Sequence, residues 1–231
     1  MSTHEVILVR HAQASFGADD YDQLSALGQA QAQRLGAWLA ETGQAPVRVV
    51  IGPRRRHRQT AQICLDAAGL ASPLQVLDGL DEMDHLELLL RRYPELTTPA
   101  ALRAALTEEA DPHRAFQKMF IAAVARWMDP AHESDYAITW QHVRRNVQQA
   151  WQQISATLDG PVWAFTSGGP IGVLAAAAVG VPDEHAFGMV WPLANAGLTR
   201  MRAGRQHPAL ISYNTWPHLE HHAHKHLLTM R

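Results

Sequence analysis

The stretch from Val6 to His11 constrains this chain more than any other, because an apolar, largely β-branched run ends abruptly in an arginine and a histidine. Such a run is typical of a buried strand, predicted here over residues 4–10. In open α/β sheets, ligands bind beyond the carboxyl ends of the strands. The strand would deliver Arg10 and His11 to that edge, where a cation beside an imidazole suits an anion and a nucleophile or base. Since the chain holds 14 histidines, the alternative is a histidine at a strand end by chance.

Strand, turn and helix then follow one another twice. Residues 25–42 carry apolar side chains at the helical period, with Ser25 as the expected N-cap and Gly43 as the stop. Residues 47–51 predict a second strand, and the Gly-Pro turn after it opens a helix over about residues 53–68. Two such units in succession indicate parallel βαβ structure.

The rest of the chain continues this alternation with one helical interruption. The sequence predicts an α/β fold of three layers, α/β/α, around a mostly parallel sheet with an antiparallel hairpin at its edge. We expect residues 1–231 to form a single domain, with the short helices over about residues 86–135 as an insertion over a site. The further predicted strands cover residues 74–77, 161–165, 196–203 and 209–213. The further helices cover 86–93, 100–109, 114–128, 140–158 and 170–179, the last with Pro170 as its first residue after two glycines.

Composition excludes several functional classes. The formal net charge of −2 and the pI of about 6.7 lack the basic excess of a nucleic-acid-binding protein. Cys64 is the one cysteine, so we expect no internal disulfide. We expect no secretory signal, and the longest apolar run, Ile171 to Val181, is too short to cross a bilayer. The sequence therefore predicts a soluble, cytoplasmic protein with no nucleic-acid partner and no membrane partner.

Polar groups follow four of the predicted strands at the same edge of the sheet. Arg10 and His11 end the first, Arg56 lies near the start of the helix after the second, Glu82 follows the third, and Gly168 opens a glycine-rich helix start. Two guanidiniums and a helix N-terminus make a cradle for phosphate. His11 beside that cradle could attack phosphorus, and Glu82, if protonated, could donate a proton to the leaving oxygen. The joint placement points to phosphoryl chemistry, although each residue alone fits a surface or core role.

Four blocks of the sequence carry a resemblance to a known family. Residues 8–12, Leu-Val-Arg-His-Ala, resemble the Arg-His-Gly signature of the histidine phosphatase superfamily, the phosphoglycerate-mutase-like proteins. Residues 52–61 look like its second block, Ser-Pro-Leu-x-Arg-Ala-x-Gln-Thr-Ala, and residues 24–31 are similar to its Leu-Thr-x-x-Gly-x-x-Gln pattern. Residues 195–199 and 218–219 also resemble family segments. The resemblance covers the whole chain in order.

The resemblance implies a role for each residue at the predicted edge. His11 would become phosphohistidine, Arg10 and Arg56 would hold the phosphoryl oxygens, and Glu82 would be the proton donor. The family's helical insertion after that acid matches residues 86–135 and usually shapes substrate choice.

Residue 167 departs from the family pattern. The last motif is typically Ser/Thr-His-Gly-Gly, but here Ser167 stands where the second histidine is expected, followed by Gly168. Losing one preorganised donor to a transition state costs about 2.7–4 kcal/mol, or roughly 10²–10³ in rate. His57 and His85 could substitute for the missing imidazole, but a plain surface role is favoured for both. We therefore expect Ser167 and Gly168 to bind phosphate in a slow or specialised phosphoric monoester hydrolase, and we do not expect an efficient mutase.

Other functions stay open beside this one. The first alternative is a catalytically weak or inactive phosphate-binding protein of the same fold. The second is a serine hydrolase with Ser167 as nucleophile, since Asp183 and His218 follow in the expected order. Against it, Phe165 stands two residues before the serine, where the Gly-x-Ser-x-Gly elbow needs a small residue.

The histidine-rich tail allows one further alternative. His218, His222 and His226 have the spacing of ligands on one face of a helix, but no acidic or cysteine partner accompanies them. Fortuitous metal affinity is the ordinary outcome for such a run. We expect a small phosphorylated substrate, no cofactor and no metal site, and we leave a homodimer open.

Overall fold

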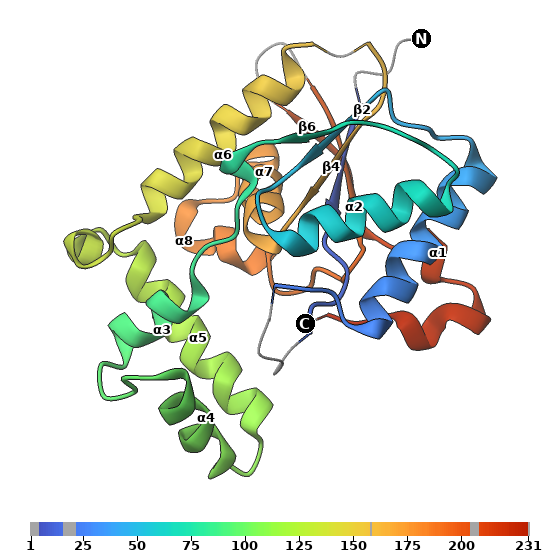
Figure 1. The fold of residues 1–231 in the computed structure, drawn as a ribbon. Coiled ribbons are helices and arrows are strands. Elements are labelled where there is room, and N and C mark those ends of the chain that lie inside the picture. Colours follow the sequence, from blue (N-terminus) through green and yellow to red (C-terminus); the bar gives the residue numbers. More distant parts are fainter. Residues whose placement is uncertain (1–4, 16–21, 158, 204–207, 231) are drawn as a thin grey trace. The chain divides into compact units, whose positions relative to one another are not determined.

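The computed structural model describes residues 5–15, 22–157, 159–203 and 208–230. Within them, the strands form one mixed sheet in the order β3-β2-β4-β1-β5-β6 (Figure 1). The strands are β1 (Glu5–Arg10), β2 (Arg48–Ile51), β3 (Leu74–Val76), β4 (Val162–Thr166), β5 (Leu198–Arg202) and β6 (Ala209–Thr215).

The strand pairing confirms the predicted sheet. β1 runs parallel to β4, and β2 runs parallel to both β4 and β3. β5 pairs antiparallel with β1 and with β6, which places the hairpin at the edge of the sheet. The register sets Arg10 opposite Thr166, so β1 and β4 end side by side.

Helices cover both faces of this sheet, as the three-layer prediction requires. Odd-numbered residues of the strands, such as Ile7 and Val9, pack in one cluster with Leu35 and Leu39 from α1 (Ala26–Thr42) and with side chains of α2 (Arg55–Ala67). The alternate residues of β1 are buried on the other face, where α7 (Gly168–Val179) contacts the strand. Side chains that alternate in this way are expected of strands buried on both faces.

Local signals fix the ends of α1. The Ser25 hydroxyl accepts a hydrogen bond from the Gly28 backbone N–H at 3.0 Å, which satisfies one of the unpaired donors of the first turn. Gly43 ends the helix with φ of 65°, a left-handed conformation that glycine adopts without strain. Both predicted capping residues are confirmed.

Two helix starts differ from their predictions by one turn or less. α2 begins at Arg55 instead of Pro53, because Arg54 is still extended, with φ of −68° and ψ of 147°. Pro170 is the third residue of α7 and not its first. Proline is tolerated there because the N–H groups of a first turn have no partner within the helix. The first residue of the predicted strand 4–10 and the last of the predicted helix 140–158 lie outside the described residues.

By its internal contacts the chain divides into two compact units, residues 1–82 with 146–231, and residues 83–145. The second unit contains α3 (His85–Arg92), α4 (Pro99–Thr107), α5 (Pro112–Met128) and the start of α6 (Trp140–Ser155). Trp127 and Trp140 pack edge to face within it, with ring centroids 5.4 Å apart. The single-domain organisation with an insertion over residues 86–135 stays a prediction.

The remaining elements are short. They are the 3₁₀ turns η1 (Asp78–Leu80), η2 (Pro130–Asp135), η3 (Phe187–Met189), η4 (Pro217–Leu219) and η5 (His222–Leu227), and the single helical turn α8 (Asp183–Ala186). Among the described residues, none of the helices combines the length and the apolar character needed to span a membrane.

Candidate active site

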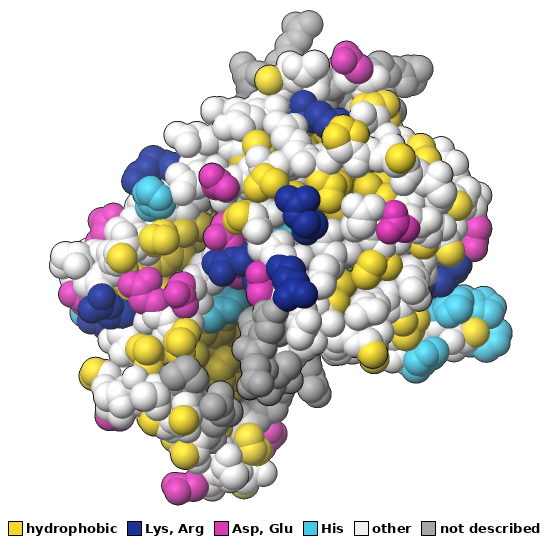
Figure 2. Space-filling model, in the orientation of Figure 1, with side chains coloured by type: hydrophobic (Ala, Val, Ile, Leu, Met, Phe, Trp, Pro, Cys, Tyr) yellow, Lys and Arg dark blue, Asp and Glu magenta, His cyan; other side chains and the backbone are white. Residues whose placement is uncertain are grey.

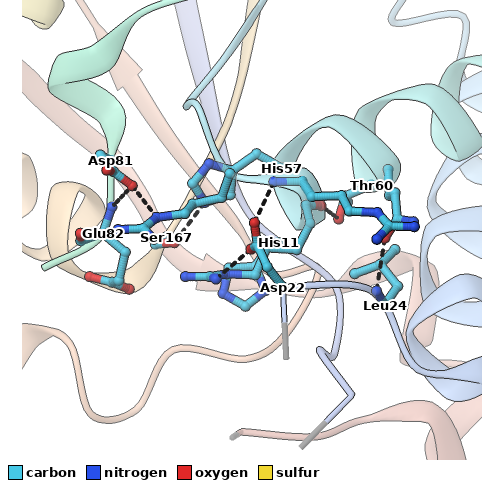
Figure 3. Close-up of polar contacts among 12 residues, drawn as sticks. His11, Asp22, Leu24, His57, Thr60, Asp81, Glu82 and Ser167 are labelled. Carbon is cyan, nitrogen blue, oxygen red and sulfur yellow. Dashed lines mark hydrogen bonds and ion pairs between the residues drawn. The ribbon is translucent and has the colours of Figure 1, made fainter. Parts of the chain in front are cut away.

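The ends of β1 and β4 bring two segments together that are far apart in the sequence. The His11 backbone N–H donates to the Thr166 carbonyl at 2.8 Å, which extends the parallel ladder one residue beyond β1. Ser167 follows directly after. Figure 3 shows His11, His57, Ser167 and Glu82 drawn at this edge. The structure therefore confirms the predicted meeting of these strand ends.

The His11 side chain is held in one tautomer. Its Nδ1 lies 2.8 Å from the Ala12 carbonyl oxygen, and because a carbonyl can only accept, Nδ1 carries the hydrogen. Nε2 then keeps a lone pair. The His11 carbonyl accepts from the Asn195 side-chain amide and from the Ala196 backbone N–H, both at 3.3 Å. These contacts fix the backbone as well as the ring.

The charges around His11 keep its ring neutral. Burial lowers the pKa of His11 well below its usual value, and the neighbouring Arg56, Arg10 and His57 lower it further. Only 5% of the residue is exposed. At neutral pH the side chain is therefore an uncharged imidazole, the form in which it can act as a nucleophile.

Arg56 already holds an oxyanion in this structure. Its Nη1 lies 2.7 Å from one carboxylate oxygen of Asp22, whose other oxygen accepts from the Arg55 backbone N–H at 2.8 Å. The guanidinium is almost fully buried. A planar fork that binds a carboxylate here is equally suited to phosphate oxygens. Nothing in the sequence around Asp22 singled it out, because its contact with Arg56 depends on the fold.

Thr60 explains the spacing of the second motif. Its hydroxyl donates to the Arg56 carbonyl at 2.7 Å and accepts from the Ala12 backbone N–H at 3.1 Å. One helical turn after Arg56, Thr60 thus ties α2 to the segment that carries His11. The neighbouring Gln59 accepts from the Leu24 N–H at 2.8 Å and anchors the start of α1.

Arg10 lies beside the start of α7. Its Nη1 donates to the Leu193 carbonyl. A Cβ added to Gly168 would lie 3.9 Å from Arg10 Nε and only 3.0 Å from the Val190 side chain. Gly168 therefore leaves room for the Val190 side chain at the start of α7, and the Arg10 Nε lies within van der Waals distance of the same position.

The loop after η1 attaches to the end of β4. The Thr166 hydroxyl donates to the Leu80 carbonyl at 2.6 Å. Asp81 accepts from Arg54 Nε at 2.5 Å and from the Glu82 backbone N–H at 2.7 Å. Asp81 therefore orders the loop that carries Glu82, whose side chain is drawn in Figure 3. Arg54 is an anchor for this loop, because it also donates to the Glu82 carbonyl at 3.3 Å.

His57 is the residue that sequence reasoning placed wrongly. It is fully buried rather than on the surface, and its Nε2 lies 2.7 Å from the Ser167 hydroxyl. Burial and the adjacent Arg56 lower the pKa of His57 to about 3. The signal that could have found it is the stripe at positions 57, 60, 61 and 64, whose spacing of three, one and three residues marks the buried face of α2. His85 lies in the second unit, where its ring packs edge-on against Phe120.

Ser167 occupies the N-cap position of α7, but its side chain does not cap the helix. It precedes α7 with extended backbone, yet its side chain makes no hydrogen bond to the first turn of that helix. Its hydroxyl oxygen lies 2.7 Å from the His57 Nε2 instead. The partners predicted for a serine nucleophile are not those it has, since His218 packs against Trp38 with ring centroids 6.3 Å apart and Asp183 opens α8.

The histidine-rich tail does not form the single helix that a ligand spacing of four would need. His218 is buried in η4, whereas His222 and His226 belong to η5. Histidines of this segment lie at the surface (Figure 2, cyan), and the rings of His221 and His222 are 4.1 Å apart. No group of three metal-ligating side chains occurs in the described part of the chain.

Comparisons with known proteins agree with this geometry. The sequence profile of the histidine phosphatase superfamily (branch 1) matches residues 6–215. No curated protein matches the chain.

Three solved structures, two of them named as phosphatases, share the fold at low sequence identity. The Bacillus stearothermophilus protein YhfR has a TM-score of 0.64 at 18% identity, over 94% of this chain and 99% of its own. A mycobacterial glucosyl-3-phosphoglycerate phosphatase has a TM-score of 0.60 at 20% identity, over 92% and 99%. The phosphoserine phosphatase of Entamoeba histolytica, solved with 3-phosphoglyceric acid, has a TM-score of 0.56 at 18% identity, over 93% and 98%.

Proposed function

Because the chain belongs to the histidine phosphatase superfamily (branch 1), we propose that it hydrolyses small phosphoric monoesters through a phosphohistidine at His11. The observation that carries the proposal is the buried, neutral imidazole of His11, whose tautomer is set by Ala12 and whose neighbours are Arg10 and Arg56. A cytoplasmic location is kept as part of the proposal.

In the first half of the reaction, His11 Nε2 attacks phosphorus and the ester P–O bond breaks. Arg10, Arg56 and the α7 N-terminus at Gly168 hold the non-bridging oxygens, whose negative charge they offset in the transition state. Glu82 acts as general acid and gives its proton to the leaving alkoxide. The products of this step are an alcohol and a phosphohistidine.

In the second half, water attacks the phosphohistidine. Glu82, now a carboxylate, takes a proton from that water as the new P–O bond forms and the N–P bond breaks. His11 is restored with its lone pair on Nε2, and orthophosphate leaves. No cofactor or metal takes part in the proposal.

The class of substrate is proposed from the named neighbours. Solved structures of similar fold include phosphatases of glucosyl-3-phosphoglycerate and of phosphoserine, both small phosphorylated molecules. A site of two arginines and one helix N-terminus recognises the phosphoryl group that such molecules share. We do not propose efficient mutase action, because Ser167 takes the position of the second motif histidine.

Two alternative functions are each favoured by one observation. Ser167 in place of that histidine favours a phosphate-binding protein that turns over weakly or not at all. The 2.7 Å contact between His57 and the Ser167 hydroxyl favours a serine nucleophile, for which His57 would be the base. All three candidates differ in what they require of His11.

A test of the proposal compares wild-type protein with His11→Ala on a panel of phosphomonoesters that includes 4-nitrophenyl phosphate. We expect hydrolysis by the wild type, a loss on the order of 10⁴ or more in His11→Ala, and an acid-labile phosphoprotein in rapidly quenched wild type alone. His222→Ala, in the exposed tail, is the matched control and should retain full activity. Equal rates in wild type and His11→Ala would overturn the phosphohistidine route.

A further inference from the structure

Two departures from the motif pattern lie against each other in space. In the second block the pattern has alanine where this chain has His57, and in the last block it has histidine where this chain has Ser167. The His57 Nε2 and the Ser167 Oγ are 2.7 Å apart, and both residues are fully buried. The His57 imidazole of α2 therefore lies against residue 167, the position after β4 where the motif has histidine.

A third departure belongs to the same arrangement. Gly52 stands where the pattern has serine, and a Cβ added at Gly52 would lie 2.4 Å from the His57 Nδ1. Real atoms do not approach so closely, so the ring of His57 occupies the space that a side chain at residue 52 would need. The Leu80 carbonyl oxygen would lie equally close to that Cβ, at 2.4 Å, so glycine at 52 leaves room for both the His57 ring and the Leu80 backbone.

The ring of His57 also lies next to the ring of His11. Their centroids are 5.8 Å apart, and the planes are tilted by 40° (Figure 3). Any phosphoryl group on His11 would therefore lie close to the His57–Ser167 pair. The pair comes from α2 and from the start of α7, the two elements that also provide Arg56 and Gly168.

The hydrogen of this pair can be assigned from its surroundings. Burial and Arg56 lower the pKa of His57, although the Gly52 backbone near the ring raises it, and Nδ1 has no hydrogen-bond partner among the described residues. Nε2 is the ring nitrogen that has a partner, so a hydrogen on Nε2 leaves no buried ring N–H unpaired. A neutral ring with its hydrogen on Nε2 can donate to the Ser167 Oγ, and the hydroxyl then keeps its own hydrogen to donate onward.

We propose that His57 and Ser167 form a relay in which His57 Nε2–H donates to Ser167 Oγ and Ser167 O–H donates to an oxygen of the phosphoryl group on His11. The relay rests on the proposed phosphatase function and replaces the second imidazole of the motif. His57 acts as a positioning residue, because it reaches the phosphoryl group through the serine. A hydrogen bond that a hydroxyl accepts strengthens the one that it donates. The relay offers a neutral donor where the motif has a histidine.

A double-mutant cycle tests the coupling. In His57→Leu and Ser167→Ala, kcat for 4-nitrophenyl phosphate is expected to fall about 100-fold each, with little change in KM, since the lost donor acts in the transition state. The double variant is expected to lose no more than either single variant, because both changes break one chain of hydrogen bonds. His57→Gln, which keeps an N–H donor, should retain most of the rate.

A transposition tests the replacement directly. Ser167→His alone should be poorly active, because His57 already lies 2.7 Å from the position of the new side chain. His57→Ala together with Ser167→His should recover the wild-type rate or exceed it. His218→Gln, a change at an equally buried histidine that packs against Trp38, is the control for loss of a buried ring and should leave the rate unchanged.

The outcomes distinguish failure of the relay from failure of the proposed phosphatase function. A hydrolysing wild type whose His57→Leu variant keeps its kcat, or whose double variant shows the product of the two single losses, overturns the relay alone. A wild type that neither hydrolyses phosphomonoesters nor forms phosphohistidine overturns the proposed function. Loss of activity in Ser167→Ala with full activity in His11→Ala overturns both and identifies Ser167 as the nucleophile.

Discussion

At the scale of single residues, the site sets two arginines around the neutral imidazole of His11, with the neutral imidazole of His57 beside it. Arg56 and Arg10 both lower the pKa of His11, so the group that must donate an electron pair is kept free of a proton. The same arginines attract the anion that His11 must attack. Nucleophile and binding site are therefore prepared by the same charges.

Asp22 is the negative charge within this set, and its removal gives a prediction at this scale. Asp22→Asn takes away the carboxylate that Arg56 holds at 2.7 Å, so Arg56 becomes more available to phosphate. The carboxylate is about one third exposed, which limits the effect, and we expect KM for a phosphomonoester to fall roughly three- to five-fold. Steady-state kinetics at constant ionic strength measure it, with Asp66→Asn on the exposed side of α2 as control. A KM that rises instead would show that Asp22 orients Arg56.

The sequence allowed the prediction of Arg10, His11 and Arg56 because each follows a strand, and strand ends can be read from local patterns. It named His57 as a possible substitute for the missing imidazole but favoured a surface position, because burial of a polar ring depends on what packs over it. The face of α2 that carries His57 is recognisable only when polar residues are counted in the helical stripe. Asp22 was missed for a related reason, since its contact joins residues 34 positions apart.

At the scale of elements, α1 and α2 approach each other closely at a glycine. A Cβ added to Gly36 would lie 2.1 Å from the Cys64 backbone carbonyl oxygen and 2.8 Å from Ala67 Cβ. The start and end of α1 were predictable because caps are local. The order of the strands was not, since β1 pairs with β4 and β5, which lie more than 150 residues away.

Gly36→Ala follows as a prediction at this scale. In an exposed helix this change stabilises by about 1 kcal/mol, but here the backbones of two helices must move apart, and we expect a net loss of about 1–3 kcal/mol in the free energy of unfolding. Urea denaturation followed by circular dichroism measures it. Gly188→Ala, where the added Cβ meets no atom within 4 Å, is the control and should change stability by less than about 0.5 kcal/mol. A Gly36→Ala variant as stable as wild type would contradict the close packing of α1 and α2.

At the scale of the whole molecule, buried neutral histidines link folding to pH. Burial lowers the pKa values of His57 and His218 to about 3, with Arg56 and Arg34 adding to the effect. Unfolding exposes both rings, and their pKa values return to about 6.5. Above pH 6.5 both rings are neutral in the folded and in the unfolded chain, so they add no pH dependence to the free energy of unfolding.

Below pH 6.5 the unfolded chain takes up protons that the folded chain does not, so stability falls with pH until the folded pKa values near 3 are reached. At pH 5 each histidine lowers the free energy of unfolding by about 2 kcal/mol. Urea denaturation at pH 7.5 and pH 5.0 measures the difference. Because His11 is a third buried neutral histidine, His218→Gln should lose about one third of the pH dependence that the three rings contribute. The same midpoint at both pH values would count against neutral burial of these rings.

The close fit of Gly52, His57 and Ser167 also limits the order in which such a site can change by inheritance. A side chain at residue 52 would meet both the His57 ring and the Leu80 carbonyl oxygen at 2.4 Å, so glycine at 52 accompanies histidine at 57. A histidine at 57 and another at 167 would compete for one space, so the two positions exchange through an intermediate with one imidazole in excess or none at all. We therefore expect related chains to carry the imidazole at residue 57 or at residue 167, and seldom at both.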